Sequence, residues 1–125
     1  MRKIAVYTSF MKDAYRRQID AAAQRLGFEV HYFENAADFT ARIGEFEVIY
    51  SHPTPAMLQQ AKSLKWLHSD FAGIEKYLPD EVWPHPGCIL SNSSGAYGPT
   101  ISEHVVMVLL MLLHRMPEYQ RDIAM

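Results

Sequence analysis

The stretch Ile4-Ala-Val-Tyr-Thr8 is short and rich in β-forming residues, as a strand buried on both faces of a sheet should be. A helix is predicted after it, from Lys12 to Leu26, because apolar residues recur there at spacings of three and four. Gly27 supplies the left-handed stop of this helix, and Phe28 to Phe33 is predicted to be a second strand. Strand, helix and strand in this order begin an α/β pattern.

The same alternation continues along the chain. Further strands are predicted at residues 46–50, 65–69 and 88–91. Asn35 is the expected N-cap of a short helix, and Thr54 is the expected N-cap of a helix that runs to Leu64 with Pro55 in its first turn. Because strands and helices alternate four times, we expect an α/β fold, a flavodoxin-like parallel five-stranded sheet with helices on both faces. The strand order 2-1-3-4-5 is the predicted arrangement.

The last predicted element is a C-terminal helix from Thr100 to Met116, which opens on a Thr100–Glu103 capping box. Nine consecutive apolar residues, Val105 to Leu113, make this helix apolar all round, whereas a surface helix of a small domain keeps a polar face. We therefore expect residues 1–99 to form the sheet domain and residues 100–125 to be an interdomain helix with a truncated tail. Self-association through Thr100–Met116 would cover the apolar surface, so a homo-oligomer such as a dimer is predicted.

Composition and charge exclude several classes of protein. With 12 basic and 14 acidic residues the net charge is −2, so neither nucleic acid nor a membrane surface is an expected partner. The longest apolar run, Val105 to Leu113, is well short of the roughly 20 residues that a membrane span needs. The single cysteine, Cys88, is expected to be a small buried side chain in a reducing, cytoplasmic compartment. The six histidines offer no convergent set of three ligands, so no metal is expected.

Two loops carry the candidate binding residues. Residues 69–74 follow the fourth predicted strand and residues 92–99 follow the fifth, so both loops lie at the carboxyl edge of the sheet, where α/β proteins bind ligands. Gly73 lets a ligand approach the backbone, and the N–H groups beside it favour an anionic group. The hydroxyl of Tyr97 can donate to a substrate oxygen, so these features suit a small carboxylate. The simpler alternative for Ser91–Gly95 is a turn whose polar side chains bond to the local backbone.

Three segments in these regions carry a family resemblance. They are Leu64-Lys-Trp-Leu-His-Ser-Asp-Phe-Ala-Gly-Ile-Glu75, Leu90-Ser-Asn-Ser-Ser-Gly95 and Ala96-Tyr-Gly-Pro-Thr-Ile-Ser-Glu-His104. In this order and spacing they resemble the N-terminal substrate-binding (catalytic) domain of the D-isomer-specific 2-hydroxyacid dehydrogenases. That family has a Leu-Lys segment ending in Gly-(Val/Ile)-(Asp/Glu), an Asn-x-x-Gly turn and an Ala-Glu-His opening to an apolar helix. Ser102 stands where the family usually has Ala.

The resemblance implies a two-domain oxidoreductase. Such an enzyme interconverts 2-oxo acids and D-2-hydroxy acids by hydride transfer with NAD or NADP. In the family, backbone N–H groups of the loop matching Ala72 and Gly73 hold the substrate carboxylate. The residue matching Tyr97 faces the substrate, and the position matching Thr100 lies near the nicotinamide.

Other parts of the family pattern have no match in this chain. The dinucleotide-binding domain, the catalytic Arg, Glu and His, and a returning C-terminal helix all lie beyond the point matching Met125. We therefore expect no catalytic residue among residues 1–125, no cofactor bound to them, and no activity from this chain alone. The alternative hypothesis is a stand-alone flavodoxin-like binding or interaction module. A phosphotransfer receiver is disfavoured, because Ser9-Phe10 and Ser51-His52 stand where it needs acidic residues.

Overall fold

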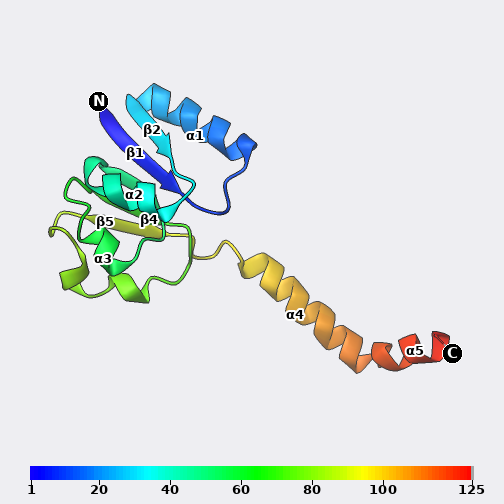
Figure 1. Cartoon of the computed structure of the whole chain (residues 1–125). Helices are drawn as coiled ribbons and strands as arrows, with labels where there is room; N and C mark the ends of the chain where they lie inside the picture. The colour runs from blue at the N-terminus through cyan, green and yellow to red at the C-terminus, as the bar shows by residue number, and fades with distance from the viewer. Residues whose placement is uncertain (125) are drawn as a thin grey trace. The chain divides into compact units, whose positions relative to one another are not determined.

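Five parallel strands form a single sheet in the order β2-β1-β3-β4-β5, as the sequence predicts. Figure 1 draws these strands as arrows. The computed structural model describes residues 1–124 and divides the chain into two compact units, one of residues 1–93 and one that begins at Ser94. The predicted division into residues 1–99 and 100–125 stays a prediction, and Met125 lies outside the described residues. The strands, all in the first unit, are β1 (Arg2–Tyr7), β2 (Phe28–Tyr32), β3 (Val48–Ser51), β4 (Trp66–Ser69) and β5 (Ile89–Asn92).

Local chemistry sets the ends of the helices between the strands. Gly27, at a φ of 73°, ends the first helix in the left-handed conformation. The side chain of Asn35 accepts a hydrogen bond of 2.9 Å from the N–H of Asp38, and the side chain of Thr54 accepts one of 3.3 Å from the N–H of Met57. All three predicted helix boundaries are confirmed. The helices are α1 (Asp13–Leu26), α2 (Ala36–Arg42) and α3 (Pro55–Leu58), with 3-10 turns at η1 (Ile43–Glu45), η2 (Glu75–Tyr77) and η3 (Asp80–Val82).

Helix α3 is shorter than the sequence predicts. It ends at Leu58, whereas the predicted helix runs to Leu64. After its end the N–H groups of Gln60 and Ala61 bond to carbonyls three residues earlier, which tightens the chain into turns. These turns bring Ala61 and Leu64 into the core, where both are fully buried. Burial of two apolar side chains therefore overrides the helical pattern.

One face of the sheet carries the core of the first unit. Side chains alternate between the two faces of each strand, so Ala5, Ile49 and Leu67 point to the same side. Phe39 of α2 and Leu58 of α3 pack against them, and all five are fully buried. The half-buried thiol of Cys88 also packs against this cluster, and its burial raises the pKa of the thiol.

The opposite face of the sheet is only partly covered within the first unit. Helix α1 packs beside β2 on this face, which confirms helices on both sides. Between α1 and the strands lies an open, largely apolar groove of about 880 Å³. Trp66 is 43% exposed and Ile89 is 64% exposed along this groove.

The second unit consists of two helices over its described residues, α4 (Gly98–Leu113) and α5 (Met116–Ile123). The predicted capping box is wrong, because α4 begins at Gly98 and Tyr97 is its N-cap, without a side-chain capping bond. Proline suits a first turn, and Pro99 starts the helix before Thr100 can cap it. The helix also ends three residues before the predicted Met116. A left-handed Arg115, at a φ of 53°, then separates it from α5.

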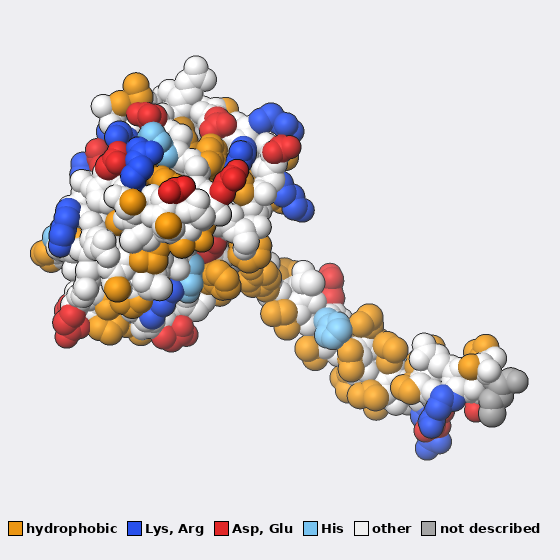
Figure 2. All heavy atoms as spheres, in the orientation of Figure 1, with side chains coloured by type: hydrophobic (Ala, Val, Ile, Leu, Met, Phe, Trp, Pro, Cys, Tyr) orange, Lys and Arg blue, Asp and Glu red, His pale blue; other side chains and the backbone are white. Residues whose placement is uncertain are grey.

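Helix α4 is apolar all round, as predicted. None of its side chains is buried, and Figure 2 shows hydrophobic side chains over much of its visible surface. Helix α5 is the other helix of its unit, and it has only eight residues with which to cover α4. No helix within residues 1–124 is long and apolar enough to cross a membrane.

The two faces of β4 give a test of this one-sided core. Leu67→Ala should lower the free energy of unfolding by about 2–5 kcal/mol, because it leaves a cavity at a fully buried position. Trp66→Ala, one residue away on the open face, should cost less than about 2 kcal/mol although it also removes the bond from Nε1 to Ser91. Urea denaturation measures both. Equal losses would contradict the assignment of the core to one face.

Self-association through α4 is a second prediction. Leaving four large apolar side chains in water instead of burying them costs roughly 6–12 kcal/mol, at about 1.5–3 kcal/mol each. Sedimentation at micromolar concentration should therefore show a dimer or a larger species. Replacing Leu109 and Leu112 by Glu should shift the protein toward monomer, and the same change at exposed Gln18 and Gln24 of α1 is the control. A wild-type monomer at this concentration would refute the prediction.

Candidate functional site

The loop of residues 70–73 follows β4 at the carboxyl edge of the sheet. β4 and β5 pair in parallel with Ser69 opposite Asn92, so the loops that leave the two strands start side by side. The side-chain amide of Asn92 donates a 2.6 Å hydrogen bond to the carbonyl of Ala72. Ser93 donates from its N–H to the carbonyl of Phe71 and from its hydroxyl to the carbonyl of Ser69, both at 3.3 Å. Residues at the end of β5 thus hold residues 70–73, the candidate loop, through hydrogen bonds to carbonyl groups of that loop.

Two consecutive backbone donors remain free in this loop. Within residues 1–124, the N–H groups of Ala72 and Gly73 donate no hydrogen bond. Both residues are exposed, so the two donors can be reached from solvent. An adjacent pair of unpaired N–H groups suits the two oxygens of a carboxylate.

The charged side chain of Glu75 lies beside Gly73. A Cβ atom added to Gly73 would lie 3.0 Å from the Oε2 atom of Glu75. The negative charge of Glu75 opposes an anion at this place, but the side chain is exposed and can move aside at little cost. Because Gly73 has no side chain, a ligand can still approach its N–H group past the side chain of Glu75.

A cavity of about 500 Å³ lies next to this loop, where β1 to β4 end. Asp70 and Phe71 of the candidate loop form part of its wall, and Asp70 is only 6% exposed. Its other lining residues are Tyr7, Thr8, Ser9, Met11, Arg16, Phe33, Glu34, Ser51 and His52.

His52 forms part of this cavity wall. Its Nδ1 atom lies 2.9 Å from the hydroxyl oxygen of Ser69, and its ring centre lies 4.6 Å from that of Phe71. Burial lowers the pKa of His52, the charge of Lys76 lowers it further, and Asp70 offsets part of the shift. The imidazole is therefore neutral near pH 7 and serves as a hydrogen-bonding group rather than a cation.

Lys76 and Tyr77 tie the segment after β4 to the segment after β3. The Lys76 ammonium donates to the carbonyl of His52 at 3.4 Å, and the Tyr77 hydroxyl donates to the carbonyl of Pro53 at 2.7 Å. Burial lowers the pKa of Lys76 and raises that of Tyr77. The signal for this cluster was the presence of polar residues at the ends of β3 and β4, two neighbouring strands.

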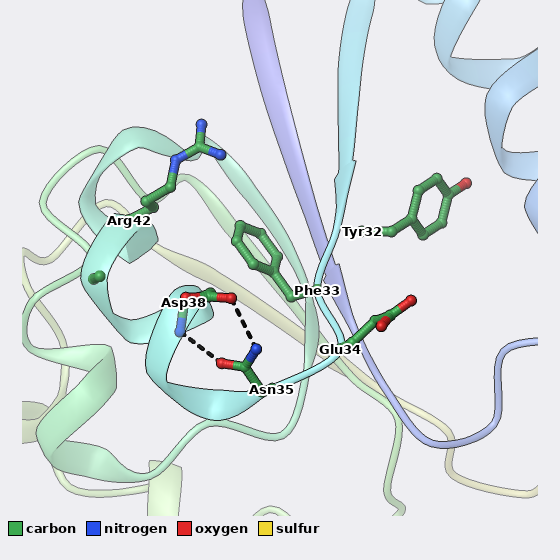
Figure 3. Close-up of a pocket in the computed structure, with 7 residues that line it drawn as sticks. Tyr32, Phe33, Glu34, Asn35, Asp38 and Arg42 are labelled. Carbon is green, nitrogen blue, oxygen red and sulfur yellow. Dashed lines mark hydrogen bonds between the residues drawn. The ribbon is translucent and has the colours of Figure 1, made fainter.

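Two other kinds of site, a metal site and a hollow beside α2, lack suitable free binding groups. Residues 1–124 contain no group of three or more His, Cys, Asp or Glu side chains that could hold a metal ion. A hollow of about 450 Å³ lies beside α2, where Asn35 and Asp38 point toward each other and Arg42 lies apart (Figure 3). Asn35 bonds to both the side chain and the backbone of Asp38, and Arg42 bonds to Glu45, so these polar groups are already paired within the protein.

The predicted site residues fall in both units. Ala72 and Gly73 lie together in the first unit, while Tyr97 and Thr100 belong to the second. Tyr97 is half-exposed at the start of α4, and Thr100 lies exposed in the first turn of that helix. Gly95, at a φ of 82°, forms a turn closed by the N–H of Gly98. The simpler alternative for Ser91–Gly95 is wrong about the side chains, because those of Asn92 and Ser93 bond to the distant backbone of Ala72 and Ser69 instead of the local backbone. The roles of Tyr97 and Thr100 stay predictions.

Comparisons with known proteins find similarity among solved structures. No family model matches the chain, and no curated protein matches it. A D-isomer-specific 2-hydroxyacid dehydrogenase family protein from Aeromonas salmonicida has a similar structure, with a TM-score of 0.73 and 27% sequence identity. The match covers 96% of this chain and 38% of that protein.

Two further structures share the fold at lower identity. A D-lactate dehydrogenase with NAD⁺ from Lactobacillus jensenii has a TM-score of 0.57 and 14% identity, over 88% of this chain and 35% of its own. A phosphoglycerate dehydrogenase from Lactobacillus plantarum has a TM-score of 0.54 and 24% identity, over 89% of this chain and 35% of its own. The predicted resemblance is thereby confirmed: this chain has the fold of a partial domain of the D-isomer-specific 2-hydroxyacid dehydrogenases and spans little more than a third of their length.

Proposed function

We propose that this chain is the substrate-binding part of an NAD- or NADP-dependent D-2-hydroxyacid dehydrogenase, an oxidoreductase that interconverts 2-oxo acids and D-2-hydroxy acids. The observation that carries the proposal is the pair of free N–H groups at Ala72 and Gly73, on a loop that matches the family motif. The similarity to the Aeromonas salmonicida protein supports the same assignment.

In this proposal the substrate carboxylate binds at the candidate loop. Each of its two oxygens accepts a hydrogen bond from one N–H group, of Ala72 or of Gly73, and the negative charge strengthens both bonds. Asn92 keeps the loop in place through the carbonyl of Ala72. Tyr97 is proposed to donate its hydroxyl hydrogen to another substrate oxygen, as the family resemblance implies.

The nicotinamide cofactor belongs to the proposed full-length enzyme. The loop after β1, where a dinucleotide fold carries its glycine-rich turn, reads Thr8-Ser9-Phe10 and has no glycine. These residues do not fit a dinucleotide, so we assign no cofactor site to the sheet of this chain and no catalytic residue to residues 1–125. Thr100 is proposed only to lie near the nicotinamide. A cytoplasmic location is part of the proposal, because the single free thiol of Cys88 suits a reducing compartment.

Two substitutions of Gly73 test the carboxylate site. Gly73→Val should weaken binding of pyruvate at least about tenfold, a loss of about 1.4 kcal/mol, because its branched side chain blocks the approach to the N–H groups. Gly73→Ala should change the dissociation constant less than about threefold, since its Cβ atom meets only the mobile side chain of Glu75. Isothermal titration calorimetry measures both, and thermal unfolding checks that each variant is folded.

Tyr97→Phe is the companion variant. It removes one hydroxyl and should cost about 1–3 kcal/mol of binding if a substrate oxygen is left unpaired. Pyruvate binding that is unchanged in Gly73→Val would contradict the proposed function. Unchanged binding in Tyr97→Phe alone would remove only Tyr97 from the site.

A further inference from the structure

The groove between α1 and the sheet remains open within the first unit. Side chains of β1, β3, β4 and β5 form its floor, and one face of α1 forms its wall. Most of the lining is apolar, and it includes Val48, Trp66 and Ile89 on the strands and Ile19 and Leu26 on the helix. A continuous apolar surface that stays exposed on a small domain marks a site of interaction with another apolar surface.

The polar groups of the groove are already bonded within the protein. Nε1 of Trp66 donates a 2.8 Å hydrogen bond to the hydroxyl of Ser91, and Nδ1 of His68 lies 2.8 Å from the same hydroxyl oxygen. The two basic side chains of the lining both pair with the carboxylate of Glu47. An apolar occupant can therefore cover the groove without leaving these groups unpaired, which would be costly.

Helix α4 supplies an apolar surface of the kind that the groove lacks. Its run Val105–Leu113 carries no charged side chain, and none of the side chains of α4 is buried. A helix that only covers the sheet of its own domain keeps a polar outer face, and α4 has none. It therefore needs apolar surface on more than one side. A second copy of this chain offers both a second groove and a second α4.

The size of α4 matches the size of the groove. A helix of 16 residues is about 24 Å long and about 10 Å across. Half of such a cylinder has a volume of about 940 Å³, close to the 880 Å³ of the groove. One helix sunk halfway into one groove buries at most about 750 Å² over both partners, and a reciprocal pair buries at most about 1,500 Å². Stable interfaces bury about 1,200–2,000 Å², so only the reciprocal pair is large enough.

We propose that this groove is the docking site for α4 of a second copy of the chain, and that two copies exchange these helices reciprocally. The same contact made in both directions about a twofold axis closes at two copies, so the product is a dimer. This inference goes beyond the proposed function, because it uses none of the groups around Ala72 and Gly73. It gives the predicted self-association through α4 a definite partner surface.

A glutamate in the floor of the groove tests the docking site. Ile89→Glu should raise the dissociation constant of the dimer at least about tenfold, because its charge would be buried against α4. Leu78→Glu is the matched control, since Leu78 is 67% exposed, Ile89 is 64% exposed, and Leu78 lies outside the groove. It should change the constant less than about threefold. Sedimentation equilibrium of the 125-residue chain measures both variants, and thermal unfolding checks that each is folded. Should Ile89→Glu not fold, Leu26→Glu on the wall of the groove replaces it.

Mixing two variants separates docking in the groove from packing of α4 against α4. Ile89→Glu keeps an intact helix, and the double variant Leu109→Glu with Leu112→Glu keeps an intact groove. Each alone should be monomeric at micromolar concentration. Their equimolar mixture should contain a heterodimer in native mass spectrometry, because one intact helix then meets one intact groove. Dimerisation of Ile89→Glu as tight as that of the wild type, or a mixture without heterodimer, would overturn the proposal.

The emission of Trp66 reports directly whether the groove is covered. The chain has two tryptophans, so Trp83→Phe leaves Trp66 as the single emitter. Its emission should move to shorter wavelength over the concentration range in which the chain dimerises, because α4 of the second copy excludes water from the groove. Emission that does not depend on concentration would overturn the proposal. A wild-type chain that stays monomeric would overturn both the docking site and the predicted self-association, and it would leave the proposed carboxylate site unaffected.

Discussion

Parallel pairing of the strands is the constraint on which the candidate site depends. All five strands run in one direction, so every carboxyl end lies at the same edge of the sheet. Residues far apart in the sequence are thereby neighbours, as the bond between Asn92 and Ala72 demonstrates. Leu67 of β4 and Ile49 of β3 hold the two middle strands in the core. His52 and Asp70 come directly after these two strands and so lie at the carboxyl edge.

At this edge of the sheet, carbonyl groups of the candidate loop are hydrogen-bonded, whereas the N–H groups of Ala72 and Gly73 are not. Asn92 and Ser93 occupy carbonyl groups of the candidate loop and leave its N–H groups at Ala72 and Gly73 unpaired. A few residues earlier, Asp70 offers an acceptor without a donor. An anionic ligand would pair with the free N–H groups, whereas the Oδ1 atom of Asp70 is buried within the protein.

Features set by local chemistry could be predicted from the sequence, and features set by tertiary packing could not. Gly27, Asn35 and Thr54 end or cap helices through bonds within a few residues, so their patterns were sufficient. Helix α3 was predicted too long because the burial of Leu64 is a tertiary effect. In the site, Gly73 was visible as part of a motif. The unpaired Oδ1 atom of Asp70 could not be predicted from the sequence, because it depends on where the donors of other loops lie.

The central claim is that the backbone N–H groups of Ala72 and Gly73 bind a carboxylate, and amide NMR tests it most directly. Pyruvate and its neutral analogue pyruvamide are titrated into the ¹⁵N-labelled chain, and the amide signals of the loop are followed. The account predicts that pyruvate moves the amide protons of Ala72 and Gly73 downfield to saturation, while pyruvamide leaves them nearly in place. Signals that stay fixed with pyruvate, or that respond equally to both compounds, would contradict it.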